Sequence, residues 1–371
     1  MRIGVPKERR PGERRVALTP ETVKRLAAAG HELLVEAGAG TAAGYPDREY
    51  TQVGATLTDE IAVWAAGLVV KVDRPLPEEV ARLRAGAVLV AMLQHLSEPT
   101  LVGELAQRGV TAFAMDWMPR ITRAQDMDAR SSMSTVQGYE AVLLGAELLP
   151  RMMPMLMTAA GTVAPSRVLV IGAGVAGLSA IATARRLGAV VEGFDVRPAT
   201  REQVESLGGR FVALDAELAD TQDAQGYARA QSDEILELER QTLARRLPSV
   251  DLVVSTALIP GKKPPVLLTA TMVESMRAGS VIVDVAAPFG GNCELTRPGE
   301  TVEHAGVRVV GAADLESRKA YHASQMYSRN VLNYLNYLLK DGKLALNFED
   351  ELVSFPLITH AGEVRAAAGG A

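Results

Sequence analysis

Residues 167–197 read RVLVIGAGVAGLSAIATARRLGAVVEGFDVR, and this stretch decides the fold. Its apolar start predicts a buried parallel strand, which runs directly into a G-x-G-x-x-G turn at Gly172, Gly174 and Gly177. The first glycine permits the tight exit from the strand, the second lets a pyrophosphate approach the backbone, and the third lets the following helix pack closely. A second strand ends at Asp195. Strand, turn, helix, strand and acid in this order predict a dinucleotide-binding βαβ unit.

The charged residues at the end of the second strand favour NAD(H) over NADP(H). Asp195 lies 18 residues after Gly177, where a carboxylate can accept hydrogen bonds from the adenosine ribose hydroxyls and would repel a 2′-phosphate. Arg197 could instead pair with such a phosphate, so the preference stays open. The helix N-terminus would bind the pyrophosphate through its N–H groups and dipole. From the motif, the cofactor-binding residues are Gly172, Ala173, Gly174, Val175, Ala176, Gly177, Asp195, Val196 and Arg197.

Length and composition are typical of a cytoplasmic enzyme with two domains. The chain has 371 residues, 48% of them hydrophobic, and a formal net charge of −5 with dispersed basic residues, so we expect two cores and no nucleic-acid partner. Cys293 is the single cysteine, which excludes an intrachain disulfide, and no Cys or His spacing indicates a metal site. Residues 168–184 lack formal charges, but they are too short and too rich in phased glycines for a membrane span. The N-terminus has no apolar signal-peptide core, and we therefore expect no membrane insertion.

Apolar runs alternate with helix-like segments on both sides of the glycine turn. The first 117 residues contain the runs RIGVPK, HELLVEAG, GLVVKV, AVLVAML and VTAFAMDW, and GRFVAL, DLVVSTAL, SVIVDVAA and VRVVGAA continue the pattern later. Long amphipathic segments at 134–149 and 321–339 bracket the nucleotide unit. We therefore predict an α/β fold of two open, doubly wound domains. A Rossmann NAD(H)-binding domain, residues 131–315, is inserted into a flavodoxin-like domain built from residues 1–130 and 316–371.

Three irregular segments lie between the predicted elements, and loops held by rigid sheets often carry chemistry. Residues 119–134, PRITRAQDMDARSSMS, are dense in Arg, Gln, Asp and Ser. Residues 215–233 are acidic and contain Gly226 and Tyr227. Residues 260–265, PGKKPP, follow a strand at the carboxyl edge of the predicted sheet.

Six motifs follow one another along nearly the whole chain, namely GVPKE, RRVALTP, PRITRAQDMDARSS, VLVIGAGVAGL, STALIPG and GGNCE. In this order and at these separations, they resemble the NAD(H)-binding component of the proton-translocating nicotinamide nucleotide transhydrogenases. Alanine dehydrogenases share the two-domain architecture, and GVPKE, RRVALTP and the glycine motif do not separate the two. The resemblance therefore implies either direct hydride transfer between NAD(H) and NADP(H), or NAD-dependent oxidation of alanine.

The two reactions differ in their need for a proton acceptor. Oxidation of an amino acid requires a side chain that takes a proton from the amine, whereas hydride transfer between two nicotinamides requires positioning. Alanine dehydrogenases are similar to this chain at Arg15, Lys71 and His95, which could bind a carboxylate and manage protons. However, Pro288 stands where those enzymes carry a catalytic aspartate, and the Arg-x4-Gln-x2-Asp-x2-Ser spacing of residues 120–131 is similar to the transhydrogenase signature. Both observations favour the transhydrogenase.

The resemblance implies catalytic roles for four residues of this loop. Asp128 and Ser131 would hold the carboxamide and the nearby ribose of NAD(H), Gln125 would reach toward NADP(H), and Arg120 would steady the NAD(H) side. Orientation of this kind can contribute about 7–11 kcal/mol to a bimolecular step. In the structural alternative, the loop is a charged connector whose serines cap the next helix.

The same resemblance adds residues outside this loop. The acidic segment around Tyr227 is similar to a mobile loop that folds over the nucleotide, with Gly226 as a hinge; the alternative is an ordinary surface excursion. Thr256 and Ala257 of STALIPG belong to the cofactor-binding set. The chain departs from the family pattern at Lys263, where a proline is more usual.

The resemblance also implies partner chains. The sequence contains neither a second glycine-rich dinucleotide unit for NADP(H) nor a membrane span for a proton path. A Re/Si-specific, proton-translocating enzyme of this kind is active only with an NADP(H)-binding subunit and a membrane-spanning subunit. It is expected to be a homodimer at the cytoplasmic face of the inner membrane complex. Candidate interfaces are the helices near 134–149 and 321–339, and the methionine-rich segment 151–157 is interpreted as core filling or a subunit contact.

A non-enzymatic interpretation stands beside these two. A redox sensor would bind NAD(H) and signal by a change of shape. It predicts nucleotide binding without turnover, which distinguishes it from both dehydrogenase and transhydrogenase.

Overall fold

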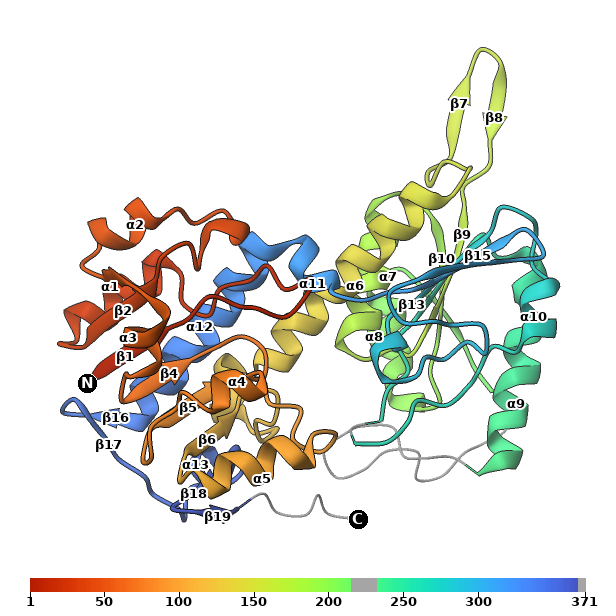
Figure 1. Cartoon of the computed structure of the whole chain (residues 1–371). Helices are drawn as coiled ribbons and strands as arrows, with labels where there is room; N and C mark the ends of the chain where they lie inside the picture. Colours follow the sequence, from red (N-terminus) through yellow and green to blue (C-terminus); the bar gives the residue numbers. More distant parts are fainter. Residues whose placement is uncertain (215–231, 260, 366–371) are drawn as a thin grey trace. The chain divides into compact units, whose positions relative to one another are not determined.

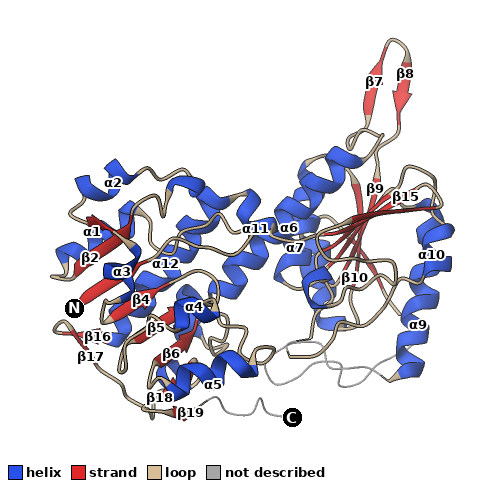
Figure 2. Ribbon diagram, in the orientation of Figure 1, coloured by secondary structure: helices blue, strands red, loops and turns tan. Residues whose placement is uncertain are grey.

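The structure, a computed structural model, describes residues 1–214, 232–259 and 261–365. These residues fall into two compact units, of which the first combines Met1–Met133 with Glu316–Ala371 and the second is Ser134–Leu315 (Figure 1). Both units are α/β, with open and mainly parallel sheets, as Figure 2 shows, and this confirms the predicted fold class. The first change of unit falls at 133/134, inside helix α6 (Ala129–Leu148), whereas the sequence suggested 130/131.

The first unit is built on eight described strands in the order β19-β18-β6-β5-β4-β1-β2-β3. Their bounds are β1 Arg2–Val5, β2 Glu32–Glu36, β3 Thr56–Thr58, β4 Leu68–Val70, β5 Val88–Ala91, β6 Thr111–Ala114, β18 Leu357–His360 and β19 Glu363–Val364. The five strands predicted from apolar runs lie in the order β2-β1-β4-β5-β6, which is the flavodoxin-like order 2-1-3-4-5. The sequence patterns missed β3 at one edge and the antiparallel β18 and β19 at the other.

Helices cover this sheet, and the last long one belongs to its core. The helices of the unit are α1 Pro20–Ala28, η1 Thr41–Ala43, α2 Asp47–Gln52, α3 Glu60–Trp64, α4 Pro77–Val80, α5 Pro99–Gln107, η2 Thr122–Met127, α12 Ala320–Leu338 and α13 Glu351–Ser354; a small hairpin, β16 Leu339–Lys340 with β17 Lys343–Leu344, follows α12. Eleven residues of α12 are buried. The helix is therefore part of the core, and its buried face is not available as the dimer interface expected at 321–339.

The second unit has a sheet of seven described strands in the order β11-β10-β9-β12-β13-β15-β14. Their bounds are β9 Arg167–Ile171, β10 Val190–Phe194, β11 Arg210–Val212, β12 Leu252–Ser255, β13 Val281–Asp284, β14 Thr301–His304 and β15 Val307–Gly311. All neighbours are parallel except β14 with β15. Without β14, this is the Rossmann order 3-2-1-4-5-6, whose direction reverses between β9 and β12. Sheets of this class bind ligands at the carboxyl ends of the strands at such a switch point.

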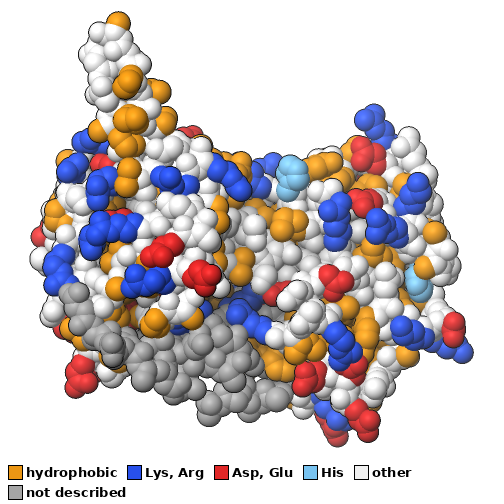
Figure 3. Space-filling view, turned by 180° about the vertical axis from the view of Figure 1, so that it is seen from behind, with side chains coloured by type: hydrophobic (Ala, Val, Ile, Leu, Met, Phe, Trp, Pro, Cys, Tyr) orange, Lys and Arg blue, Asp and Glu red, His pale blue; other side chains and the backbone are white. Residues whose placement is uncertain are grey.

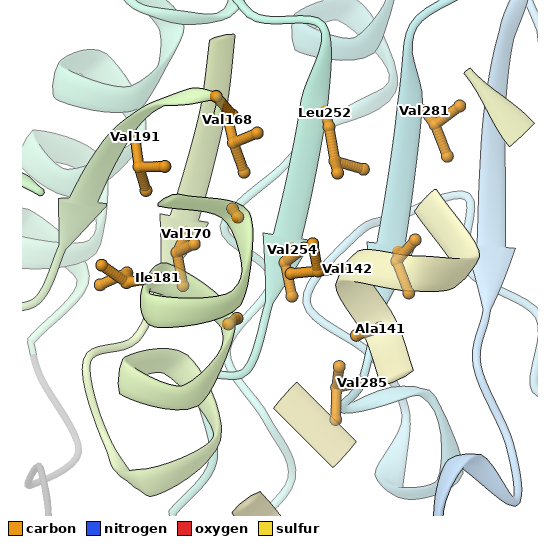
Figure 4. Close-up of a cluster of buried hydrophobic side chains, with 14 of the residues drawn as sticks. Ala141, Val142, Val168, Val170, Ile181, Val191, Leu252, Val254, Val281 and Val285 are labelled. Carbon is orange, nitrogen blue, oxygen red and sulfur yellow. The ribbon is translucent and has the colours of Figure 1, made fainter. Parts of the chain in front are cut away.

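Apolar side chains fill both faces of this sheet. Val168 and Val170 of β9 lie on one face with Leu252 and Val254 of β12, packed under Val142 of α6 (Figure 4). The alternate residues of the same strands belong to a second cluster, under helices α9 Asp233–Ala244 and α10 Ala270–Glu274. The remaining helices of the unit are α7 Val175–Arg186, η3 Pro198–Thr200, α8 Arg201–Ser206, η4 Leu247–Ser249 and η5 Ala287–Phe289, and α11 Leu315–Arg318 leads back to the first unit. Burial of both faces explains why these strands read as continuous apolar runs.

A hairpin of β7 (Leu156–Thr158) and β8 (Gly161–Val163) projects from the second unit (Figure 1). Hydrophobic side chains gather on this projection (Figure 3), among them Met155 at 58% and Met157 at 78% exposure. Met153, at the foot of the hairpin, is buried in the core. Of the two expectations for 151–157, core filling holds for Met153, and the exposed methionines leave the subunit contact as a prediction.

Candidate functional site

The three glycines after β9 have different surroundings. Gly172 has a φ of +89°, a conformation that side chains other than glycine rarely adopt. A Cβ on Gly177 would lie 1.8 Å from the carbonyl oxygen of Gly172, so the first turn of α7 packs against the glycine turn only without a side chain there. Among the described residues, apart from its two chain neighbours, a Cβ on Gly174 would meet no atom within 4 Å. Packing against the described residues therefore does not require Gly174, and the space beside its backbone is open to a ligand.

This contrast separates stability from binding. We expect Gly174→Ala to fold with an unchanged melting temperature and to bind NADH at least about tenfold more weakly, because its methyl group would project toward the pyrophosphate. Gly177→Ala is expected to lower the melting temperature, because the added carbon overlaps a backbone carbonyl. Thermal unfolding and NADH titration of both variants measure this. Equal stability with equal binding in the Gly174 variant would contradict the assignment.

Helix α6 lies directly against the N-terminal turn of α7. A Cβ on Gly138 would lie 1.9 Å from the carbonyl oxygen of Ala176, and the Ser179 hydroxyl donates a hydrogen bond of 2.7 Å to the carbonyl of Thr135. Gly138 was not predicted from the sequence, because a glycine inside a helix does not reveal what it packs against. The contact fixes α6 on the turn that carries the free N–H groups of α7.

Asp195 connects the end of β10 to the glycine turn. Its Oδ2 accepts a hydrogen bond of 2.7 Å from the backbone N–H of Ala173, and its two oxygens accept two hydrogen bonds of 2.8 Å from the Arg197 guanidinium. The charge of Arg197 is therefore already engaged by Asp195, which weakens the argument that it serves a 2′-phosphate. Val196, between them, packs against the core of the unit.

A second carboxyl group, which the sequence did not predict, lies in the field of Asp195. Glu239 on α9 is 3% exposed, and burial together with the charge of Asp195 raises its pKa to about 7, although Arg240 opposes this. A carboxyl group with a pKa near 7 keeps only part of its negative charge at neutral pH, so Asp195 remains the main group that would repel an additional phosphate. No sequence signal separates Glu239 from the other acids of its helix.

The loop after β12 is held against the glycine turn. Thr256 donates from its hydroxyl to the carbonyl of Gly172 at 3.0 Å, and its backbone N–H donates to that of Ile171 at 2.8 Å. The next residue, Ala257, makes two hydrogen bonds with the side chain of Asn292. The Asn292 side chain accepts from the backbone N–H of Ala257 at 3.1 Å and donates to the carbonyl of Ala257 at 2.9 Å. The two expected residues Thr256 and Ala257 thus lie beside the turn.

Asn292 and Asp284 form the support of this loop. Asn292 also accepts from the Ser255 hydroxyl at 2.6 Å and donates to the carbonyl of Pro265 at 2.9 Å. Asp284, at the end of β13, accepts from the backbone N–H groups of Asn292 and Cys293 at 2.7 and 3.1 Å. This network was not predicted from the sequence. The motif GGNCE contains Asn292, but it gives no indication of the side chain's hydrogen-bond partners.

The loop of residues 120–131 contains the short helix η2 and the start of α6. The carboxylate of Asp128 accepts from the backbone N–H of Ser131 at 2.9 Å and from its hydroxyl at 2.6 Å. Asp128 therefore caps α6. The alternative in which this loop is a connector whose serines cap the next helix changes accordingly, because the capping residue is Asp128. Arg120 and Gln125 are exposed. The structure thus joins Asp128 to Ser131 and presents Gln125 at the surface of the first unit.

Other expected residues lie at the surface or beyond the part of the chain that the structure describes. Tyr227 and Gly226 lie outside the described residues. Pro288 and Lys263 are exposed, as is Phe289 beside Pro288, and the Cε of Lys263 would lie 3.3 Å from a Cβ built on Gly290. Residues 285–292, which include Pro288, contain no ionisable side chain.

Arg15 and Lys71 are buried in ion pairs inside the first unit. Lys71 Nζ lies 3.1 Å from Glu8 Oε2 and 3.0 Å from Glu79 Oε2, and all three side chains are at most 2% exposed. Arg15 pairs with Glu13. Burial raises the pKa of Glu13, but the charge and hydrogen bonds of Arg15 outweigh this effect and hold that pKa at about 2. Both cations are therefore neutralised by carboxylates of the chain.

His95 differs from these two residues. Both of its ring nitrogens are buried and lack a hydrogen-bond partner among the described residues. Burial lowers its pKa, although the charge of Asp116 opposes this, so the ring is neutral near pH 7. Its ring packs edge-on against Trp117, with centroids 5.1 Å apart.

Two general properties of the described residues complete the site. No group of three His, Cys, Asp or Glu side chains in this part of the chain is arranged to hold a metal ion. None of the helices that the structure describes combines the length and the apolar character needed to cross a membrane.

Comparison with known proteins gives consistent matches along the chain. The family models "Alanine dehydrogenase/PNT, N-terminal domain" and "Alanine dehydrogenase/PNT, C-terminal domain" match residues 4–137 and 141–367. An NAD(P) transhydrogenase subunit alpha protein of Rhodospirillum rubrum is 48% identical, covering 98% of this chain and 97% of that protein. The transhydrogenase structure from Sinorhizobium meliloti has a TM-score of 0.86 and 40% identity, covering 99% and 100% of the two chains. Alanine dehydrogenase of Bacillus subtilis is 35% identical over 82% of this chain and 74% of that protein.

Proposed function

The chain belongs to the alanine dehydrogenase/PNT family, and within that family we propose that it is the NAD(H)-binding subunit of a proton-translocating, Re/Si-specific NAD(P) transhydrogenase. It would transfer hydride directly between NAD(H) on this chain and NADP(H) on a partner subunit. The observation that carries the proposal is the loop of residues 120–131, in which the joined Asp128 and Ser131 follow an exposed Gln125. Full-length similarity to transhydrogenase alpha subunits supports it.

The residues after β9 and β12 fit a dinucleotide. The N–H groups at the start of α7 and the bare backbone at Gly174 would receive the pyrophosphate, and Asp195 would face the adenosine ribose. NAD(H), when bound, supplies or accepts the hydride. Asp128 and Ser131 would orient its carboxamide, Arg120 would steady the same side, and Gln125 would reach toward the NADP(H) of the partner. The chain contributes orientation and needs no general acid or base.

The alternative activity, oxidation of alanine, has less support. Such a reaction needs a group that takes a proton from the substrate amine, and the segment around Pro288 supplies none. Arg15 and Lys71, which would bind a carboxylate, are paired with Glu13 and with Glu8 and Glu79. A new carboxylate would have to compete with these buried partners.

One experiment separates the three interpretations. The purified chain is mixed with NADH and a transhydrogenase NADP(H)-binding subunit loaded with NADP+, and in parallel with NAD and alanine. Hydride transfer in the first mixture alone is the expected result. Turnover of alanine would establish the dehydrogenase, and NADH binding without turnover in either mixture would favour the redox sensor.

Partner subunits complete the proposal. A membrane-spanning subunit would carry the proton path, and proton movement would couple to hydride transfer through changes of nucleotide affinity on the partner. The chain would then be peripheral, at the cytoplasmic face of the inner membrane complex. NADP(H) would stay on the partner subunit, consistent with the carboxylate of Asp195 at the end of β10.

We also propose a homodimer, with the β7–β8 hairpin as part of its interface. Met155 and Met157 expose an apolar surface on this hairpin, and Met152 adds to it at the hairpin's foot. A projecting apolar hairpin is unfavourable in water unless another surface covers it. A second copy of the chain is the covering surface that the resemblance implies.

The dimer is tested by a change that leaves the core intact. Met155→Ser/Met157→Ser is expected to shift the chain from dimer to monomer in light scattering, with NADH affinity within about twofold of wild type, because both side chains are exposed in the unit. Ile61→Ser is the control, since Ile61 is 78% exposed in the other unit. A variant that remains dimeric would remove the hairpin from the interface.

A further inference from the structure

The turn that presents Gln125 is fastened by polar side chains from distant parts of the chain. We call this set the η2 clamp; it consists of Arg123, Asn330, Asn333, Tyr337 and Asp350. All of these residues belong to the first unit. Arg123 lies on η2 itself, and the other four lie on α12 or at the start of α13.

Two asparagines hold the backbone on one side of Gln125. Asn330 Nδ2 donates a hydrogen bond of 2.8 Å to the carbonyl oxygen of Asp126, and Asn333 Nδ2 donates another of 3.2 Å to the same oxygen. A carbonyl has two lone pairs, so both bonds can form together. They replace the partner that this carbonyl lacks at the end of a short helix.

An ion pair holds the backbone on the other side. The two terminal nitrogens of Arg123 donate to the two oxygens of Asp350 at 3.2 and 3.0 Å, in the bidentate geometry that fixes a guanidinium most firmly. Tyr337 donates from its hydroxyl to Asp350 Oδ2 at 2.5 Å. Hydrogen bonds from Arg123 and Tyr337 hold the pKa of Asp350 at about 2, so it is charged throughout the neutral range.

Gln125 depends on its neighbours for its position. Its side chain is exposed and makes no hydrogen bond to a described residue, while Ala124 and Met127 of the same turn are buried. A 3₁₀-helix of six residues has poor hydrogen-bond geometry and little stability of its own. The clamp fixes Arg123 and Asp126, which stand two residues before and one residue after Gln125.

We propose that the residues of the η2 clamp are positioning residues for hydride transfer, which act through the placement of Gln125. The inference rests on the proposed function, because it gives Gln125 its task toward NADP(H). The clamp residues themselves contact neither nucleotide. Their loss therefore changes the rate of transfer and leaves the binding of NADH unaffected.

The test uses the full chain with Arg123→Ala/Asn333→Ala, two changes at partly exposed positions. Single-turnover hydride transfer to the NADP(H)-binding subunit is expected to slow by about tenfold or more, since small misplacements of reacting groups are costly. The dissociation constant of NADH should stay within about twofold. Amide hydrogen exchange in residues 122–127 should become faster, which reports the loosened turn without any turnover.

Matched controls separate positioning from general damage. Arg48→Ala/Asn336→Ala removes the same two side-chain types at exposed positions of the same unit and should change neither rate nor exchange. When Asn333→Gln replaces Asn333→Ala in the double variant, a carboxamide donor is kept, and part of the lost transfer rate should be recovered. In a Gln125→Asn background, the clamp changes should add little, because they act through that residue.

The outcomes distinguish the two proposals. If the wild-type chain transfers no hydride with the partner subunit, the proposed function fails and this inference fails with it. If the wild type transfers hydride and the clamp variant matches its control, the proposed function stands and the inference is overturned. Full additivity with Gln125→Asn would also overturn it.

Discussion

Gln125→Asn is expected to slow hydride transfer on the order of 100-fold while the affinity for NADH stays within about twofold. The substitution keeps the carboxamide and withdraws it by one bond length, and a misplacement of this size can cost about two orders of magnitude in rate. The side chain is exposed and carries no described hydrogen bond, so the fold loses nothing measurable. The effect belongs to the transition state, because ground-state binding of NADH does not involve this group.

Stopped-flow kinetics measures the rate of hydride transfer, and NADH titration of the same preparation measures the affinity for NADH. Gln52→Asn is the control, since Gln52 is a glutamine exposed on α2 in the same unit. Parallel losses of rate and NADH affinity in the Gln125 variant would mean that the loop is a structural connector. An unchanged rate would remove Gln125 from the reaction.

The fold was predictable where burial leaves a local pattern. Strands β9, β12 and β13 are buried on both faces, and their apolar runs showed them clearly. Strands β8 and β14 are exposed or half-exposed, and they were missed because no apolar run marks them. β3, β18 and β19 were missed as well, since they are short strands at a sheet edge or next to it, and their position depends on the strands beside them.

The site was predictable to the extent that its contacts are local. Asp128 and Ser131 stand three residues apart and meet across one helical turn, a spacing that is visible in the sequence. Asn330 and Asp126 stand 204 residues apart, and no local rule links them. The same applies to Glu239, whose closeness to Asp195 depends on how α9 packs on the sheet. Sequence patterns thus point to candidate functional groups and miss the groups that hold them in place.

The ion pairs of Lys71 with Glu8 and Glu79 were likewise not predicted from the sequence. Their removal is the second change for which we expect a large effect. We expect Lys71→Met to destabilise the first unit by about 3–5 kcal/mol, because it leaves the buried carboxylates of Glu8 and Glu79 without their cation. Both tryptophans, Trp64 and Trp117, lie in this unit. Urea unfolding followed by tryptophan fluorescence therefore reports its stability directly.

Two further variants identify the cause. Lys24→Met replaces an exposed lysine of α1 and should change the unfolding midpoint little. Lys71→Met/Glu8→Gln/Glu79→Gln removes the uncompensated charges and should recover much of the loss. A Lys71 variant as stable as Lys24→Met would show that the buried ion pairs contribute nothing, and an alanine-dependent activity lost with Lys71 would reinstate the substrate role.

The size of the Lys71 effect depends on pH, and its sign follows from Glu8. Burial raises the pKa of Glu8 from its usual 4.5 to about 7 even though Lys71 lowers it. A raised pKa means that the folded state binds the proton more tightly than the unfolded state, so this contribution is complete below about pH 4.5 and is lost as the pH rises through 7. Without Lys71, the pKa of Glu8 must be higher still. The difference in unfolding free energy between Lys71→Met and wild type should therefore be larger at pH 8 than at pH 6, and the opposite trend would contradict a buried carboxylate as the source.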